Sequence, residues 1–492
     1  MTRPIATLAA LLALGCATTE VSSPAARPRP LTLAYQLDVS RDKVPTMASL
    51  RRLVDILADL GYDELQLYTE HVFAYAAHES VWRFSSPMTP AETRELDDYC
   101  AARGVALVPN QNTFGHMERW LKHPQYRGLA ERPEAGGRYP RWGAYVIRAP
   151  RSLCPTDPRS LEFVAGLLDE LLPCFRAPLV NVGCDEVLEL EDPEGKGRSA
   201  AALAERGAAA VYLDYLVGLE ALCSARSRRM MFWGDMVLRH PELLPQLPPS
   251  ALCLDWGYEA DHPFLAETAL LKTNGVPFRV CPGTSAWGSL SGRFANMTGN
   301  VDAAVDAALA NGADGVLLAD WGDGGHPNPL LVSLPAIVYT AYRVRGMKLT
   351  RAQLAAAIDE VVAGRGVGEA IIAYGGVYAA SGGRQGNSTE LYHLLVDGAD
   401  YRRGEGVSEA TLAAARSEWR AAAAKAAAAT APDWVRDDFE LLALLYRAVE
   451  VRLDEGAVKN FRARFESEYR RLWLKSNRPG GLDESLLEVF GK

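Results

Sequence analysis

Eight short apolar runs, separated by segments with helical periodicity, fill the chain between residues 31 and 349. The runs are Leu31–Val39, Glu64–Tyr68, Ala106–Pro109, Leu179–Val182, Arg229–Trp233, Leu252–Trp256, Phe278–Cys281 and Gly315–Ala319. Helical periodicity between them is clear at residues 47–60, 90–103, 200–225 and 301–311. Eight strand–helix units over roughly 300 residues are typical of a (β/α)8 barrel, in which parallel strands close into a cylinder inside a ring of helices.

A doubly wound open sheet is the alternative way to arrange alternating strands and helices. Its dinucleotide-binding form carries a GxGxxG turn after the first strand, and no such turn follows Leu31–Val39. The sequence therefore predicts an α/β fold, a (β/α)8 (TIM) barrel, over residues 31–349.

The sequence changes character beyond residue 350. Alanine-rich stretches flanked by charges predict helices at residues 351–363, 408–429, 434–453 and 458–474. Alanine is the strongest helix former, so the low-complexity stretch at 413–429 is expected to be helical rather than disordered. We expect residues 350–492 to form a helical C-terminal region that packs against the barrel.

The first 30 residues have the features of an export signal. Arg3 precedes an apolar stretch from Ile5 to Leu14 that is too short to span a membrane. Gly15-Cys16 resembles a bacterial lipobox, which predicts a signal peptide over residues 1–16 and a lipid anchor on Cys16. An ordinary cleaved signal peptide is the alternative. Residues 17–30 predict a disordered tether, and the protein is expected to be exported, as an outer-membrane lipoprotein or in the periplasm.

Charge and cysteine spacing narrow the class of partner. The net charge of −9 argues against nucleic acid and against an anionic membrane surface, so we expect membrane contact only through the lipid. The eight cysteines form no CxxC pair and no zinc-ligand spacing. We therefore expect neither a metal nor a cofactor.

In a (β/α)8 barrel the chemistry takes place in the loops that follow the C-terminal ends of the strands. Polar and aromatic residues collect at these positions: Arg41, Glu70, His71, Asn112, His116, Asp185, Glu186, Trp233, Asp235, Trp256, Tyr258, Trp287, Trp321 and Asp323. Aromatic faces combined with carboxylates and an arginine suit a pyranose, whose C–H faces stack while its hydroxyls bind acids. The set predicts a glycan substrate.

The adjacent acids Asp185 and Glu186 indicate one kind of glycosidase. Neighbouring residues cannot easily place carboxylates on opposite sides of a sugar, about 5 to 5.5 Å apart, as a retaining acid and nucleophile require. They can reach the same face, where one orients a substrate acetamide that serves as nucleophile and the other protonates the leaving oxygen. Asp185 is the predicted orienting residue and Glu186 the predicted general acid and base. Mutual repulsion is expected to raise the pKa of one of them.

Several of these segments resemble the family 20 glycoside hydrolases, the β-N-acetylhexosaminidases. The segments are LDVSR (37–41), VPNQNTFGH (108–116), VNVGCDE (180–186), FWGD (232–235) and DWGD (320–323). The resemblance extends over about residues 31–345, and the Asp-Glu motif is its specific part.

The resemblance implies a role for each matching residue: Arg41 and Asp323 bind sugar hydroxyls, His116 supports the acid, and Trp233, Trp256 and Trp321 enclose the N-acetyl sugar. The sequence differs from the family pattern at Asn110, where a glutamate is usual, and at Glu70-His71. No tyrosine follows the seventh strand to bind the acetamide oxygen, so Tyr258 is the candidate. The implied activity is that of a divergent, exo-acting, retaining glycosidase that removes terminal β-linked N-acetylhexosamine.

Two other functions are compatible with the same residues. His71, His116 and His326, with Asp235 or Asp323, could bind a metal at the mouth of a hydrolytic barrel. The chain could also be a non-catalytic outer-membrane lipoprotein that binds glycans.

Overall fold

The structure is a computed structural model that describes residues 31–134, 137–138, 146–147, 150–191, 196–382, 386–398, 408–452 and 455–490. The predicted signal peptide (1–16) and tether (17–30) lie outside the described residues, so export and the lipid anchor stay predictions.

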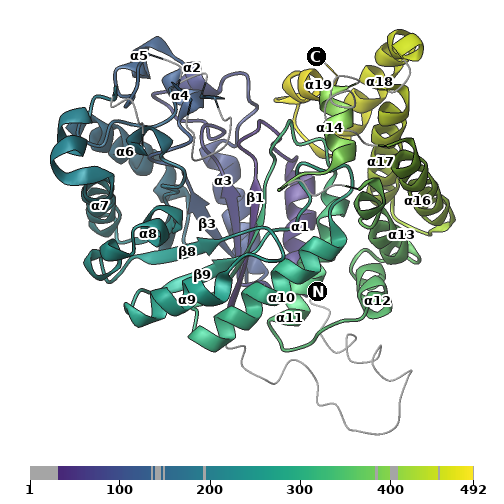
Figure 1. Ribbon diagram of the computed structural model, residues 1–492, viewed down its shortest axis with the longest axis horizontal. Helices are drawn as coiled ribbons and strands as arrows, with labels where there is room; N and C mark the ends of the chain where they lie inside the picture. Colours follow the sequence, from purple (N-terminus) through teal and green to yellow (C-terminus); the bar gives the residue numbers. More distant parts are fainter. Residues whose placement is uncertain are drawn as a thin grey trace, which may run out of the picture.

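Eight parallel strands close into a barrel, which confirms the predicted fold (Figure 1). The strand order around the barrel is β1-β10-β9-β8-β7-β6-β3-β2. The strands are β1 (Thr32–Asp38), β2 (Glu64–Tyr68), β3 (Ala106–Asn110), β6 (Leu179–Asn181), β7 (Arg229–Trp233), β8 (Leu252–Trp256), β9 (Phe278–Cys281) and β10 (Gly315–Asp320). A separate antiparallel pair, β4 (Gly137–Arg138) and β5 (Val146–Ile147), lies in the connection between β3 and β6.

Buried amides cross-link four strands inside the barrel. Asn110 Nδ2 donates to Gln36 Oε1 at 3.1 Å and to Gln66 Oε1 at 3.2 Å, and Asn181 Nδ2 donates to Gln66 Oε1 at 3.3 Å. Buried polar groups need such partners, so this layer accounts for the asparagine at position 110.

Helices cover the outside of the barrel. They are α1 (Met47–Asp59), α2 (Glu79–Trp82), α3 (Pro90–Ala102), α4 (Glu118–Leu121), α5 (Pro124–Arg127), α6 (Pro158–Leu171), α7 (Ala200–Ala225), α8 (Asp235–Arg239), α9 (Phe264–Thr273), α10 (Phe294–Asn311) and α11 (Leu334–Arg343). Short 3-10 helices are η4 (Leu172–Cys174), η5 (Leu188–Glu191), η6 (Pro241–Gln246), η7 (Leu330–Val332) and η8 (Val377–Ser381). The helix predicted from periodicity at residues 301–311 is present, and α10 extends it toward the N-terminus as far as Phe294.

Helix α7 is long and apolar enough to cross a membrane, yet it belongs to the core of the barrel domain. Tyr212, Tyr215, Leu216 and Leu219 are buried on one of its faces. The hydroxyl of Tyr212 donates to the backbone oxygen of Cys184 at 3.0 Å. The apolar composition of α7 is therefore explained by its packing on the barrel.

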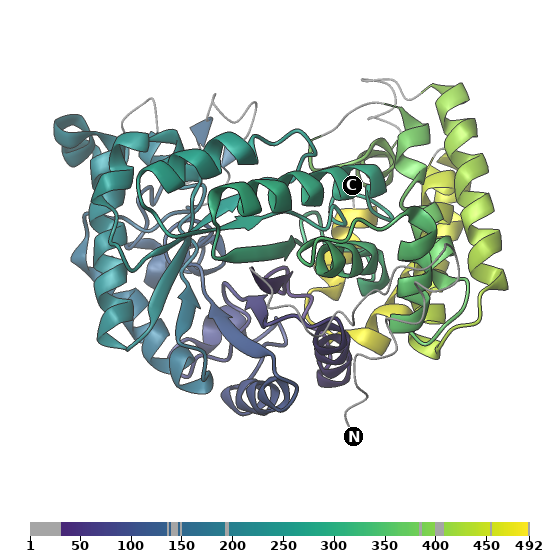
Figure 2. The same cartoon turned by 90° about the horizontal axis from the view of Figure 1, so that it is seen from below.

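The C-terminal helices lie along one side of the barrel (Figures 1 and 2). They are α12 (Arg351–Val361), α13 (Val367–Tyr374), α14 (Glu390–Asp397), α16 (Glu409–Ala428), α17 (Asp433–Arg452), α18 (Glu455–Ser476) and α19 (Leu482–Phe490). Four of these were predicted from the sequence, and the short helices α13, α14 and α19 were not.

One apolar core runs through the barrel wall and the C-terminal helices. Polar contacts also join the two regions: Tyr392 OH donates to the backbone oxygen of Gly324 at 2.7 Å, and the Arg478 backbone N–H donates to the oxygen of Val44 at 2.8 Å. Gly324 follows β10, so α14 is fastened to the rim where the strands end.

Candidate active site

The turn after β6 directs both Asp185 and Glu186 into one cavity of about 680 Å³. Neighbouring side chains on an extended strand point to opposite faces. This alternation is broken here because Gly183, Cys184 and Glu186 have positive φ angles of 73°, 75° and 48°. Non-glycine residues with positive φ are uncommon and gather at functional sites.

Close packing from neighbouring segments holds this turn in place. A Cβ on Gly115 would lie 2.5 Å from the backbone oxygen of Asp185, and a Cβ on Gly183 would lie 2.4 Å from Asn112 Oδ1. Only glycine fits at either position without displacing the acids. The Tyr212 hydroxyl on Cys184 secures the turn from the opposite side.

His116 contacts both acids. Its Nε2 atom lies 3.3 Å from Asp185 Oδ2 and 3.4 Å from Glu186 Oε2. Burial and the charge of Arg151 lower the pKa of His116, but Asp185 and Glu186 outweigh them, and the pKa is raised well above its usual value. The two carboxylates thus favour the protonated imidazole, whereas Arg151 Nη2, 2.9 Å from His116 Nε2, opposes it.

Arg151 is a site residue that the sequence did not reveal. Its Nη2 atom donates to Glu186 Oε2 at 2.8 Å, and its side chain is only 4% exposed. Arg151 precedes α6 in a segment with no recognisable motif, so only the folded chain places it beside the acids.

The expected rise in an acid's pKa by mutual repulsion does not occur at Glu186. Burial raises the pKa of Glu186, but the hydrogen bond and charge of His116, followed by those of Arg151, lower it to about 2. The sequence-based expectation took account of the repulsion between the two acids alone. It did not include His116 and Arg151, which contact Glu186 and stabilise its carboxylate.

Two buried acids behind the cavity have raised pKa values. Burial, together with the charge of Asp185, raises the pKa of Asp235 to about 7, while Arg239 opposes this shift. Burial also raises the pKa of Glu70 to about 7, against the charge of Arg41.

An aromatic wall lines the cavity opposite these charges. It consists of Trp233, Trp256, Tyr258, Trp287 and Trp321. Tyr258 stacks on Trp256 with ring centroids 5.2 Å apart and meets Trp287 edge-on at 5.0 Å. The Tyr258 hydroxyl accepts a hydrogen bond from Trp321 Nε1 at 2.7 Å, so its own proton points to another acceptor. Such a wall suits the C–H face of a sugar ring.

Arg41 lines the cavity and is held by three acids. Its Nη2 atom lies 2.7 Å from Asp323 Oδ1, its Nη1 atom 3.4 Å from Glu70 Oε1, and its Nε atom 3.6 Å from Asp38 Oδ2. Arg41 is thus both a cavity residue and the centre of an ion-pair network.

Four predicted substrate-binding residues do not line the cavity. Glu70 lies behind Arg41, and Asp235 Oδ2 accepts from the Glu186 backbone N–H at 3.2 Å. Asn112 Nδ2 donates to Tyr68 OH at 3.0 Å and to Asp185 Oδ1 at 3.3 Å. His71 is buried against Asp42, with Nε2 at 2.7 Å from Oδ1. The first three contact residues of the site, whereas His71 does not.

The cavity has further lining residues that sequence reasoning missed: Glu118, Arg151, Leu188, Gly324, Asn387 and Glu488. Asn387 and Glu488 come from the C-terminal region, which therefore completes the rim. No periodicity or motif in that region could have indicated this contact.

The three histidines of the alternative metal site lie apart. His116 lines the cavity with the acids, His326 lines a different cavity beneath the C-terminal helices, and His71 is paired with Asp42. Within the described residues, they do not form a compact group of metal-ligating atoms.

Comparisons with known proteins agree with this geometry. Residues 34–269 match the family model of the glycosyl hydrolase family 20 catalytic domain. Hexosaminidase D of Homo sapiens is 24% identical over 315 residues, which cover 59% of this chain and 60% of that protein. Hexosaminidase D of Bos taurus is 26% identical over 226 residues, covering 44% and 60%. The chain thus spans about three fifths of the length of these curated relatives.

Among solved structures, Flavobacterium johnsoniae chitobiase superposes with a TM-score of 0.53 at 13% identity, over 93% of this chain and 78% of that one. This likeness shows a shared fold. The match over residues 34–269 shows that this part of the barrel is similar to the glycosyl hydrolase family 20 catalytic domain.

Proposed function

We propose that the protein is an exo-acting β-N-acetylhexosaminidase that removes a terminal β-linked N-acetylhexosamine with retention of configuration. The observation that carries this proposal is the turn at residues 183–186, which opens two adjacent carboxylates into one sugar-sized cavity. The name of the hexosaminidase D relatives supports the same class of substrate.

The two acids take different roles because they approach from one side of the cavity. Asp185 orients the acetamide of the substrate, whose carbonyl oxygen attacks the anomeric carbon. Glu186 donates a proton to the leaving oxygen and then removes one from the water that opens the cyclic intermediate.

The rest of the cavity supplies binding and orientation. Trp233, Trp256 and Trp321 pack against the faces of the sugar ring, and Arg41 with Asp323 binds its hydroxyls. The Tyr258 hydroxyl, which already accepts from Trp321, donates its proton to the acetamide oxygen. Tyr258 thus takes the place of the tyrosine that is missing after the seventh strand.

The resting site holds Glu186 as a carboxylate, because its pKa is lowered to about 2. A general acid must carry a proton when the substrate is bound. We propose that the glycan displaces Arg151 from Glu186 on binding, which removes one of the two cations that stabilise the carboxylate.

Hydrolysis of aryl β-N-acetylglucosaminides and β-N-acetylgalactosaminides by wild type, Glu186→Gln and Asp185→Asn tests the proposal. Glu186→Gln should lose most activity on poor leaving groups and retain more on activated ones. Asp185→Asn should lose activity on both, since the nucleophile is no longer oriented. Glu242→Gln, an exposed acid near α8, is the matched control and should behave as wild type.

A thiazoline that mimics the cyclic intermediate should inhibit the wild type strongly. No inhibition by the thiazoline would refute the substrate-assisted mechanism. Binding of the aryl glycosides without turnover would instead identify a non-catalytic glycan-binding protein.

A further inference from the structure

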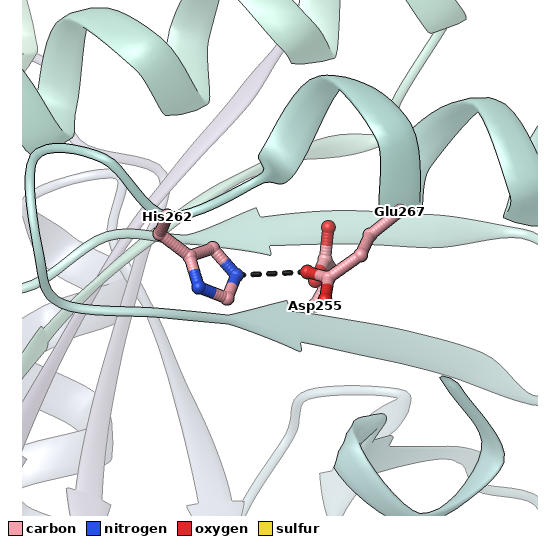
Figure 3. Close-up of side chains that lie close together, drawn as sticks. All are labelled: Asp255, His262 and Glu267. Atoms are coloured by element: carbon pink, nitrogen blue, oxygen red, sulfur yellow. Dashed lines mark ion pairs between the residues drawn. The ribbon is translucent and has the colours of Figure 1, made fainter. Parts of the chain in front are cut away.

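A second group of ionisable side chains lies on the outer side of strand β8, away from the cavity. Leu252, Leu254 and Trp256 belong to the cluster inside the barrel, so the alternating residue Asp255 points outward toward the helices. His262 lies in the loop that follows β8, and Glu267 lies in the first turn of α9. Figure 3 shows the three side chains pointing toward one another.

The ligand atoms of this group are compactly arranged. One ligand atom from each of Asp255, His262 and Glu267 lies within 4.8 Å of the others. His262 Nε2 is 2.8 Å from Glu267 Oε2. Ligand atoms on one tetrahedral zinc ion lie roughly half an ångström farther apart, so this ion pair would open by that amount to admit the ion.

The buried carboxylate of Asp255 has no hydrogen-bond donor of its own. Asp255 is 0% exposed, and neither of its oxygens has a hydrogen-bond partner among the described residues. A buried carboxylate without a partner costs several kcal/mol, so it is either protonated or bound to a cation.

The group also has access to solvent on one side. The side chains of His262 and Glu267 are 21% and 27% exposed, although the atoms that face Asp255 are themselves buried. A Cβ on Gly257 would lie within 2.3 Å of the His262 ring, so glycine at this position lets the imidazole reach the carboxylates. One imidazole nitrogen with two carboxylates suits Zn²⁺ better than Mg²⁺, which prefers oxygen ligands.

We propose that Asp255, His262 and Glu267 bind one Zn²⁺ ion that fastens the loop between β8 and α9. The loop carries Tyr258, and Trp256 ends the strand before it, so the ion stabilises part of the aromatic wall from behind. Its ligands face away from the cavity, so the ion takes no part in glycoside hydrolysis, and the proposal is independent of the proposed function.

The competing explanation is a proton shared between Asp255 and Glu267, with His262 as a cation. The zinc site and the shared proton predict different results for metal uptake. The full chain is purified, stripped with EDTA and titrated with Zn²⁺ by calorimetry, and the bound metal is counted by mass spectrometry. The wild type should bind one Zn²⁺ per chain and its Tm should rise on binding. Co²⁺ at the same site should give visible d–d absorption.

Asp255→Asn and Glu267→Gln should each weaken Zn²⁺ binding by roughly tenfold or more and abolish the rise in Tm. If Asp255→Asn does not fold, Glu267→Gln and His262→Gln test the same site from half-buried positions. The control is His240→Gln, since His240 is 26% exposed and lies 3.4 Å from Glu242 without belonging to such a group. Its Zn²⁺ binding should equal that of the wild type.

Two results would overturn the proposal. One is a stripped wild type that takes up no Zn²⁺, which would favour the shared proton. The other is Zn²⁺ binding that is unchanged in Asp255→Asn and in Glu267→Gln, which would place the ion elsewhere.

Discussion

Replacing Arg151 by glutamine should raise the pKa of Glu186. The ordinary glutamate pKa of 4.5 is lowered here to about 2, although burial acts in the opposite direction. The net shift corresponds to about 3 kcal/mol in favour of the charged form. An opposite charge at hydrogen-bond distance lowers a carboxyl pKa by about 1 to 3 units, so loss of Arg151 should bring Glu186 to a pKa of roughly 3 to 5. His116 remains, which is why the pKa does not rise further.

The pKa of Glu186 is measured most directly by infrared titration. The band of the protonated Glu186 carboxyl is identified in wild type and in Arg151→Gln as the band that disappears when Glu186→Gln is introduced into the same protein. At a pH above both values, the protonated fraction of Glu186 should be about 10- to 1000-fold larger in Arg151→Gln. Hydrolysis of poor leaving groups, which needs the acid, should therefore gain relative to hydrolysis of activated ones.

Two further variants separate charge from packing. Arg151→Lys keeps a cation and should leave the pKa of Glu186 close to the wild-type value. Arg226→Gln removes an arginine that pairs with Asp169 at 2.7 Å, far from the acid in the sequence, and should leave the pKa of Glu186 unchanged. If the infrared titration of Arg151→Gln coincides with that of wild type, Arg151 does not keep the acid ionised, and the proposed displacement by substrate has no basis.

Three further predictions concern stability and local geometry. Glu64→Gln leaves Arg279 buried without its partner at 2.6 Å, so urea denaturation should show a loss of about 3–5 kcal/mol, whereas Asp314→Asn, at the exposed end of the same arginine, should cost no more than about 1 kcal/mol. The folded pKa of Asp235 is raised to about 7, so its contribution to stability falls as pH rises from about 4 to 7; Asp235→Asn should remove this slope and stabilise the protein at pH 8 by up to ~4 kcal/mol. Gly183→Ala, at φ 73°, should lower activity at least about tenfold while circular dichroism stays unchanged, and unaltered kinetics would mean that the turn is not required.

The barrel could be predicted because each strand can be recognised from its own short stretch of sequence. Buried parallel strands are continuous apolar runs, and the observed bounds of all eight agree with the predicted ones to within one residue at each end. The first turns of α10, from Phe294 to Asn300, lie outside the predicted segment because they contain asparagine, threonine and glycine, which are weak helix formers. Packing of Met297 and Asn300 against the barrel, rather than propensity, makes them helical.

The cavity could be predicted only where its residues follow a strand. Trp233, Trp256 and Trp321 are found by this rule, because the ends of parallel strands meet at one mouth of the barrel. Arg151, Asn387 and Glu488 reach the cavity from long connections and from the C-terminal helices. Their approach depends on tertiary packing, which leaves no periodic pattern in the sequence.

The charges of the cavity are already paired before a substrate arrives, and this decides what kind of ligand it favours. Arg41 is bound to Asp323 at 2.7 Å and Arg151 to Glu186 at 2.8 Å. A charged ligand would have to replace these contacts, and the gain would be largely cancelled by the pairs that it breaks. A neutral sugar avoids that cost for Arg41 and Asp323, because hydroxyls can share donors and acceptors with an ion pair that stays intact. In the proposed mechanism, apolar contact with the tryptophan faces then supplies the net attraction, and the one pair that has to open, Arg151 with Glu186, is the pair that sets the protonation of the acid.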